Sequence, residues 1–173
     1  MSDAAVSMTW EEYQALGQDV RGEYIDGTLV VIPPPDKFHQ RAARRLANQL
    51  EEACRERAEV QVQCGWKPAA DEFVPDIMVV PPNEQVASFT GTPYLLVEIL
   101  SSNRSDDLVR KASKYALLGA PRYWILDPRD MTLIAFELRH VAYQEVSRVT
   151  GGATANLDFG VGVVEVCPSA LFG

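Results

Sequence analysis

Two carboxylates stand in runs that are otherwise largely apolar, and a lysine lies in the mixed segment that follows them. Asp76 lies in the run FVPDIMVV, Glu98 in YLLVEILSS, and Lys111 in the segment SDDLVRKASKYALLG that follows. An unpaired carboxylate is rarely left inside an apolar strand because losing its hydration is costly, so a cation, a metal ion or solvent at a strand end should compensate it. Two carboxylates and one ammonium group in a shared pocket are the groups that metal-assisted phosphodiester hydrolysis requires.

Each group has a definite part in that chemistry. Mg²⁺ takes hard oxygen ligands and is commonly held by one or two protein carboxylates together with water and substrate phosphate. The ion polarises the phosphate and lowers the pKa of a water, while a lysine orients that water or stabilises the developing negative charge. On spacing alone, an ordinary buried ion pair between Glu98 and Lys111 is the more frequent interpretation, and both interpretations are open here.

Five other polar or aromatic residues could belong to such a site or have only a structural role. Glu23 precedes a hairpin turn and is equally compatible with an exposed strand position. His39 is expected to cap or pack at a helix start rather than to contact phosphate. Tyr115 and Trp124 lie within apolar patterns, which favours the core over base stacking. Asp127 precedes a proline and is expected to end a strand.

Composition limits the classes of function. The net charge of −8, from 24 acidic and 16 basic residues, argues against a broad sequence-independent grip on nucleic acid. One helix-like segment carries a local basic surface interrupted by glutamates, which favours a solvated face with mixed ion pairs over a nucleic-acid surface: Arg41, Arg44, Arg45, Arg55 and Arg57.

The cysteines and the apolar runs bear on the cellular setting. Cys54, Cys64 and Cys167 are odd in number and far apart, so neither a disulfide framework nor a zinc site is indicated. A cysteine-based enzyme is disfavoured because neither histidine has a partner motif around a cysteine. No signal peptide or run of about 20 apolar residues is present, so we expect a cytoplasmic protein without a membrane partner.

Helix signals mark three segments that must position these groups. Thr9 and Glu12 have capping-box spacing in TWEEYQAL, which predicts a short N-terminal helix. A second helix follows the prolines at 33–35, and a third is expected over 105–119, ending at Gly119. The second helix carries an apolar stripe at helical spacing: Ala43, Leu46, Ala47, Leu50 and Cys54.

Strand signals supply the rest of the domain. Asp26-Gly27 predicts a hairpin within GEYIDGTLVVI, and TLIAFEL and VAYQEVSRV are expected to form another at Arg139-His140. VQVQCGW alternates and predicts a strand with one shared face: Val60, Val62, Cys64 and Trp66. RYWILD and the short run VGVVEV are further strands. Strands flanking a helix over 94–127 indicate a crossover unit, so we expect one α/β domain over 1–173, with a central sheet and helices packed on it.

These segments together resemble a known family. VPDIMVV and LLVEILSSNRSDDLVRKASKYALLGAPRYWILDP are similar to the Uma-type family of "putative restriction endonucleases", within the PD-(D/E)XK nuclease-like superfamily. The resemblance extends to EYIDGTLVV and to the histidine that opens the arginine-bearing helix, and its strongest block runs from Glu98 to Asp127. It implies a restriction-endonuclease-like core, with a central mixed β-sheet flanked by helices and an N-terminal helix and β-hairpin.

The resemblance also implies roles for individual residues. Asp76 matches the PD motif and Glu98 the first acid of the (D/E)-x-K motif, which makes them the implied metal ligands, with the Ile99 carbonyl as a third. Leu100 stands where the superfamily usually has its lysine, and the family pattern Asp-x-x-x-Lys-x-x-x-Tyr implies that Lys111 replaces it. Glu23 matches an additional acid near the metal. The pattern would begin at Asp107, although ILSSNRSDD is about one residue shorter than expected.

The expected function follows from that resemblance. It implies a Mg²⁺-dependent DNA endonuclease, with Mn²⁺ as a substitute ion and catalytic residues Asp76, Glu98, Lys111 and Glu23. Cutting both strands of a duplex with one site per chain would favour a homodimer. The alternative is a non-catalytic nucleic-acid-binding or assembly module that retains the nuclease fold, because the acidic net charge and the displaced lysine are compatible with both.

Overall fold

The computed structural model describes residues 5–101 and 105–173, apart from the side chains of residues 18 and 105–107. The helices are α1 Trp10–Ala15, α2 Lys37–Cys54, α3 Ser105–Leu117 and α4 Pro168–Phe172, with short 3₁₀ turns η1 Gly17–Asp19 and η2 Arg55–Arg57. The strands are β1 Ala5–Ser7, β2 Gly22–Ile25, β3 Thr28–Val31, β4 Glu59–Val62, β5 Ile77–Val80, β6 Leu95–Ile99, β7 Arg122–Asp127, β8 Thr132–Arg139, β9 Ala142–Thr150, β10 Ala155–Asp158 and β11 Val163–Val166.

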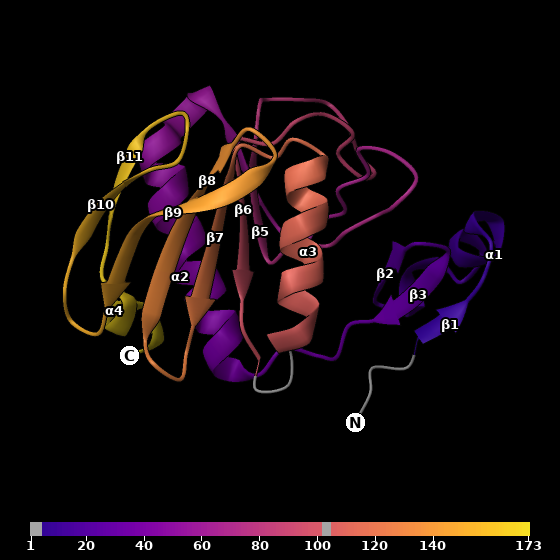
Figure 1. Ribbon diagram of the computed structural model, residues 1–173, viewed down its shortest axis with the longest axis horizontal. Coiled ribbons are helices and arrows are strands. Elements are labelled where there is room, and N and C mark those ends of the chain that lie inside the picture. The colour runs from indigo at the N-terminus through magenta and orange to yellow at the C-terminus, as the bar shows by residue number, and fades with distance from the viewer. Residues whose placement is uncertain (1–4, 102–104) are drawn as a thin grey trace.

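A six-stranded mixed sheet forms the centre of the described structure, in the order β4-β5-β6-β7-β8-β9 (Figure 1). β6 and β7 are parallel, and the other neighbouring strands are antiparallel. The parallel pair is joined by α3, which confirms the predicted crossover unit. The mixed α/β fold is therefore as expected, and the crossover brings β6, which carries Glu98, close to α3, which carries Lys111.

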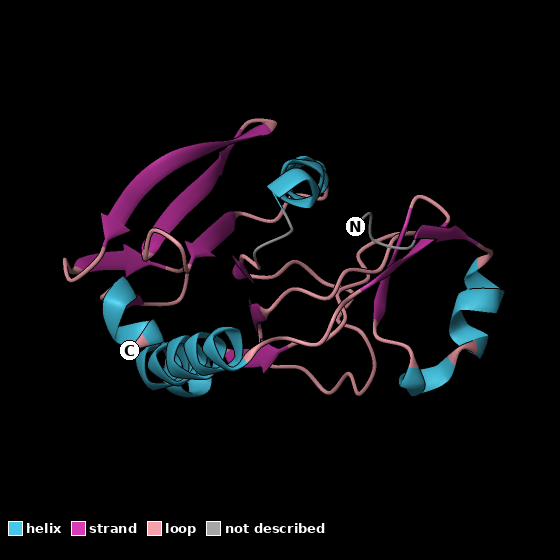
Figure 2. Cartoon of the chain, turned by 90° about the horizontal axis from the view of Figure 1, so that it is seen from below, coloured by secondary structure: helices cyan, strands magenta, loops and turns pink. Residues whose placement is uncertain are grey.

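The two faces of the sheet bury separate clusters. Figure 2 shows α2 and α4 on one side of the sheet and α3 on the other. The predicted apolar stripe of α2 is buried against Ile77, Val97 and Ile99 in the first cluster. The second cluster lies under α3 and includes Met78, Leu96 and Tyr115. Because side chains alternate along a strand, Glu98 points away from its neighbours Val97 and Ile99, toward α3.

The N-terminal segment forms its own three-stranded sheet, in the order β1-β3-β2. Thr9 and Glu12 form the predicted capping box of α1. The predicted hairpin turn is present, with φ of 52° at Asp26 and 71° at Gly27, as expected for the primed turns that match the twist of paired strands. This sheet lies beside α3 and carries Glu23 on β2 (Figure 1).

Two expectations from the sequence are wrong. The strand predicted for VQVQCGW is too long: β4 ends at Val62, because Gln63 has a φ of 52° that an extended strand cannot contain. Cys64 and Trp66 therefore do not share a strand face. Cys64 is exposed, whereas Trp66 is buried and forms isolated β-bridges outside β4. Arg41 and Arg45 are half-buried rather than part of a fully solvated helix face. Their guanidinium groups donate to backbone carbonyls at the end of α4, which need donors that the helix itself does not supply.

Some elements were not expected from the sequence: β1, β10 and α4. The other strands and helices lie close to their predicted positions, including the β8-β9 hairpin. Within the described part of the chain, no helix is both long enough and apolar enough to cross a membrane.

Candidate active site

Asp76 lies directly before β5 and is held by groups from two other elements. Its Oδ2 accepts a hydrogen bond from the backbone N–H of Ile99 at 2.7 Å, and its Oδ1 lies 3.1 Å from His39 Nε2 on α2. The antiparallel register pairs Ile77 with Val97, so Asp76 and Glu98 are the next positions along the same two strands. The Asp76 carboxylate is thus fixed at a strand end beside Glu98.

Glu98 is buried on β6 and meets two donors from α3. Its Oε1 accepts a hydrogen bond from Tyr115 Oη at 2.7 Å and lies 3.3 Å from Lys111 Nζ. Lys111 and Tyr115 are four residues apart and so project from one side of the helix. Tyr115 is in the core, as expected, but its hydroxyl also fixes the position of the Glu98 carboxylate.

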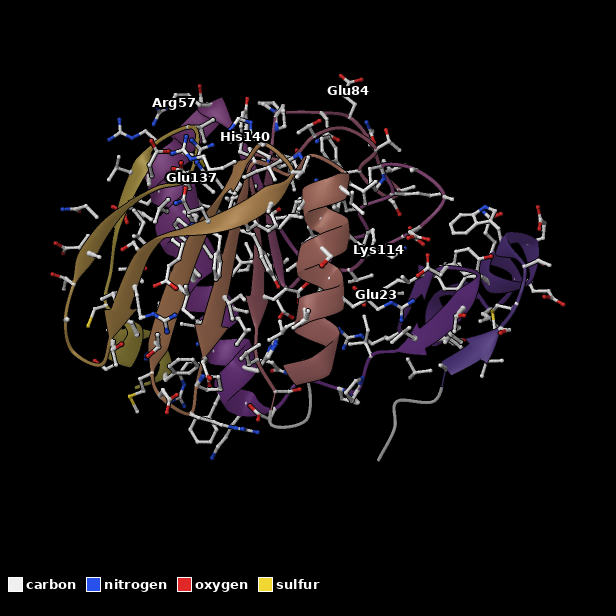
Figure 3. The ribbon with its side chains drawn as sticks, in the orientation of Figure 1. Glu23, Arg57, Glu84, Lys114, Glu137 and His140 are labelled. Atoms are coloured by element: carbon white, nitrogen blue, oxygen red, sulfur yellow. The ribbon has the colours of Figure 1, made fainter. Side chains whose placement is uncertain are left out.

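Glu23 reaches the same lysine from the N-terminal sheet. Its Oε1 lies 2.9 Å from Lys111 Nζ and accepts a hydrogen bond from the backbone N–H of Val74 at 2.8 Å. Both Glu23 and Lys111 are only 1% exposed, so the alternative of an exposed strand residue is wrong for Glu23. Figure 3 shows Glu23 beside α3, on the side of the helix that faces β2 and β3.

Lys114, the neighbouring cation on α3, is engaged elsewhere. Its Nζ lies 2.5 Å from Asp26 Oδ1 and 2.5 Å from Asp71 Oδ2, and Arg110 also pairs with Asp26. These contacts join the β2-β3 turn to α3 next to the site (Figure 3). Of the two lysines on α3, Lys111 is therefore the one that reaches Glu98.

Negative charge dominates this buried cluster. Burial raises the pKa of Glu98 from 4.5 to about 7; Lys111 opposes that rise, and the Asp76 and Glu23 carboxylates reinforce it. Burial lowers the pKa of His39, but its hydrogen bond and charge interaction with Asp76 reverse that effect and raise it overall. Three carboxylates share the ammonium of Lys111 and the imidazole of His39, and this favours binding of a further cation.

His39 is the contact that sequence reasoning missed. Asp36, not His39, caps α2, since Asp36 Oδ1 accepts hydrogen bonds from the backbone N–H groups of Phe38 and His39. The imidazole instead contacts Asp76. The signal available in the sequence was the histidine that opens the arginine-bearing helix, because the family resemblance extended to that position.

The remaining sequence candidates lie outside this cluster or outside the description. Asp127 ends β7, where its Oδ1 accepts from the backbone N–H of Arg129, as expected for a strand end. Trp124 is buried in the core on the α2 side, also as expected. The Asp107 side chain lies outside the described residues.

A divalent ion fits the residues present. Among the described residues, no group of three or more His, Cys, Asp or Glu side chains is placed to hold a metal. Asp76 and Glu98 nevertheless supply two adjacent carboxylates, which is the number of side-chain ligands that Mg²⁺ commonly takes. Burial is the main cause of the raised pKa of Glu98, and the neighbouring Asp76 and Glu23 carboxylates add to it, so a bound cation would favour the ionised form of Glu98. Asp76 and Glu98 are therefore the residues that would hold it.

The fold is that of a nuclease-like α/β protein. A solved structure described as "a putative nuclease belonging to DUF820 from Anabaena variabilis ATCC 29413" superimposes with a TM-score of 0.76 at 22% sequence identity, over 95% of this chain and 97% of that one. The chain belongs to the family described as Uma2, "Putative restriction endonuclease", whose sequence model matches residues 10–164. No curated protein shows significant sequence similarity to it. Family and fold are thus those of a restriction-endonuclease-like nuclease.

Proposed function

We propose that this protein is a Mg²⁺-dependent DNA endonuclease that hydrolyses phosphodiester bonds in an active site formed around Asp76 and Glu98. The observation that carries the proposal is the placement of these two carboxylates at adjacent strand positions, with Lys111 Nζ 3.3 Å from Glu98. Membership of the restriction-endonuclease family supports nucleic acid as the substrate. One site per chain also makes a homodimer the natural form for cutting both strands of a duplex.

The residues around the carboxylates have separate tasks in this proposal. Asp76 and Glu98 would hold the divalent ion, which would supply Lewis-acid polarisation of the phosphate and activation of the attacking water. The Ile99 N–H and His39 keep Asp76 in place, and Tyr115 does the same for Glu98. Such support matters because small displacements of catalytic groups are costly in rate.

Lys111 is the group proposed to act on the reacting phosphate. Its ammonium is a compact point charge that can stabilise negative charge developing on the phosphate oxygens or orient the attacking water. In the structure it is held between Glu23 and Glu98, so its position is fixed before substrate binds. Glu23 therefore assists hydrolysis through Lys111.

Cleavage of supercoiled DNA tests the proposal. Purified wild type should nick or linearise the plasmid in Mg²⁺ and not in chelator, and Asp76→Ala should be inactive. Glu84→Ala is the control, because Glu84 is exposed on a loop away from the carboxylates (Figure 3). Activity that survives Asp76→Ala would show a misplaced site or a contaminant. Wild type that binds DNA but never cleaves it would favour the non-catalytic module.

A further inference from the structure

A cavity of about 360 Å³ opens next to the carboxylates, on the α2 side of the strand ends. Leu100 follows β6 and Pro128 follows β7, so the cavity lies at the carboxyl ends of the parallel strand pair. In open α/β sheets this edge is where ligands commonly bind. Most of its wall is apolar: Phe38, Leu100, Pro128, Met131 and Phe172. The volume falls within the range of small-molecule sites.

The cavity shares structural elements with the candidate active site. His39 lines the cavity, and its Nε2 lies 3.1 Å from Asp76 Oδ1. Leu100 lines it too, and the preceding residue, Ile99, donates its N–H to Asp76 Oδ2. The His39 side chain is thus a neighbour of both the cavity and the Asp76 carboxylate.

Phe38 gives the cavity an aromatic wall with positive charge beside it. The side chain is 48% exposed although the ring lines the cavity. Lys37 Nζ lies 5.0 Å from the centroid of the ring, and the Arg41 guanidinium carbon lies 5.9 Å from it. Single exposed apolar residues are common and need no explanation. Proteins that bind unpaired bases combine aromatic side chains, on which the bases stack, with cations along the nucleic-acid backbone, and Phe38 with Lys37 and Arg41 supplies both kinds of group at this cavity.

We propose that this cavity binds an unpaired nucleobase of the DNA strand whose phosphate lies at Asp76 and Glu98. The base stacks on Phe38, the apolar wall surrounds it, and Lys37 and Arg41 favour the flanking phosphates. A base in an intact duplex cannot enter such a cavity without leaving its stack, so the substrate carries an extrahelical base or a single-stranded segment. This inference rests on the proposed nuclease function and specifies its substrate class.

Binding measured without hydrolysis tests the inference separately from the nuclease function. The affinity of the protein is measured in buffer that contains a metal chelator for three DNAs of one sequence: a paired duplex, a duplex with one unpaired 2-aminopurine, and the single strand. Wild type should bind at least one of the two DNAs that present an unpaired base about tenfold more tightly than the duplex, and 2-aminopurine fluorescence should change on binding. If the duplex with the unpaired 2-aminopurine binds more tightly than the single strand, the cavity takes an extrahelical base; the opposite order indicates a base of a single-stranded segment.

Variants of Phe38 show whether the cavity is responsible. Phe38→Ala should lose the preference for an unpaired base, and Phe38→Tyr should keep it because the aromatic face remains. Leu117→Ala removes a side chain that is 80% exposed on α3 and should change nothing. Equal affinity of wild type for all three DNAs, or a preference retained in folded Phe38→Ala, would overturn the inference. A preference that depends on Phe38 in a protein that never cleaves DNA in Mg²⁺ would refute the nuclease function and leave the base-binding cavity.

Discussion

Lys111 on α3 and Glu23 on β2 form an ion pair, with Nζ 2.9 Å from Oε1 and both residues almost completely buried. The same ammonium lies 3.3 Å from Glu98 on β6. One lysine therefore joins the small N-terminal sheet, the crossover helix and the central sheet. Its structural role and its proposed catalytic role have to be separated by experiment.

Lys111→Ala should lower both stability and cleavage. Removing one partner of a buried ion pair leaves the other charge uncompensated and costs about 3–5 kcal/mol in the free energy of unfolding. Denaturant unfolding measures this loss. The matched control is Lys114→Ala on the same helix, which should cost less because Lys114 is partly exposed and its pair with the exposed Asp26 contributes only about 0.2–1 kcal/mol.

A double variant separates the two roles of Lys111. Lys111→Met combined with Glu23→Gln removes the lysine together with one of its carboxylate partners, so it should recover part of the stability that Lys111→Ala loses. Cleavage should remain strongly reduced, because no lysine ammonium then acts on the phosphate beside the metal ion. A folded double variant that cleaves DNA at the wild-type rate would eliminate the catalytic role of Lys111.

Stability in chelator should fall as the pH rises from about 4.5 to 7. The pKa of Glu98 is raised from 4.5 to about 7 by burial, reinforced by Asp76 and Glu23 against the opposing effect of Lys111. The folded protein thus binds this proton more tightly than the unfolded chain, so the contribution is full below pH 4.5 and is lost as the pH passes 7. The free energy of unfolding, measured as a function of pH across this range, should fall more steeply for wild type than for Glu98→Gln, because the variant lacks this titrating group. Parallel curves would show that Glu98 does not titrate there.

Tyr115→Phe should weaken the support of Glu98. It removes the donor 2.7 Å from Glu98 Oε1, and a hydrogen bond to a charged group contributes about 1.5–3 kcal/mol. Because that bond also lowers the pKa of Glu98, the variant should raise the pKa further, which carboxylate NMR can follow. Tyr143→Phe is the control: its hydroxyl donates to the Ala120 carbonyl, so the titration of Glu98 should not change.

Local patterns were sufficient to predict much of the fold. The capping box at Thr9, the Asp26-Gly27 turn and the stripe of α2 depend on neighbouring residues, and the structure has all of them. β4 was extended too far because alternation in VQVQCGW does not reveal the positive φ of Gln63. The short strand β10 and helix α4 depend on tertiary packing rather than on a strong pattern of their own.

The site was predicted less evenly than the fold. Asp76 and Glu98 were conspicuous because each is a charge in an apolar run of sequence, Lys111 was a candidate from its place in the following helix, and the family resemblance gave Glu23 a role near the metal. Nothing in the local sequence indicated that His39 would contact Asp76, since they are 37 positions apart and meet only when α2 packs on the sheet. The docking of Arg41 and Arg45 onto α4 was hidden for the same reason.

A Mg²⁺ titration observed at the carboxylates most directly tests the central claim, that Asp76 and Glu98 bind one divalent ion together. The ¹³C carboxylate signals of both residues should shift along one single-site curve, and the melting temperature should rise with Mg²⁺ because the ion binds the folded state. Asp76→Asn and Glu98→Gln should each abolish that rise. Carboxylate signals that do not respond, or an increase in melting temperature that is unchanged in both variants, would contradict the claim.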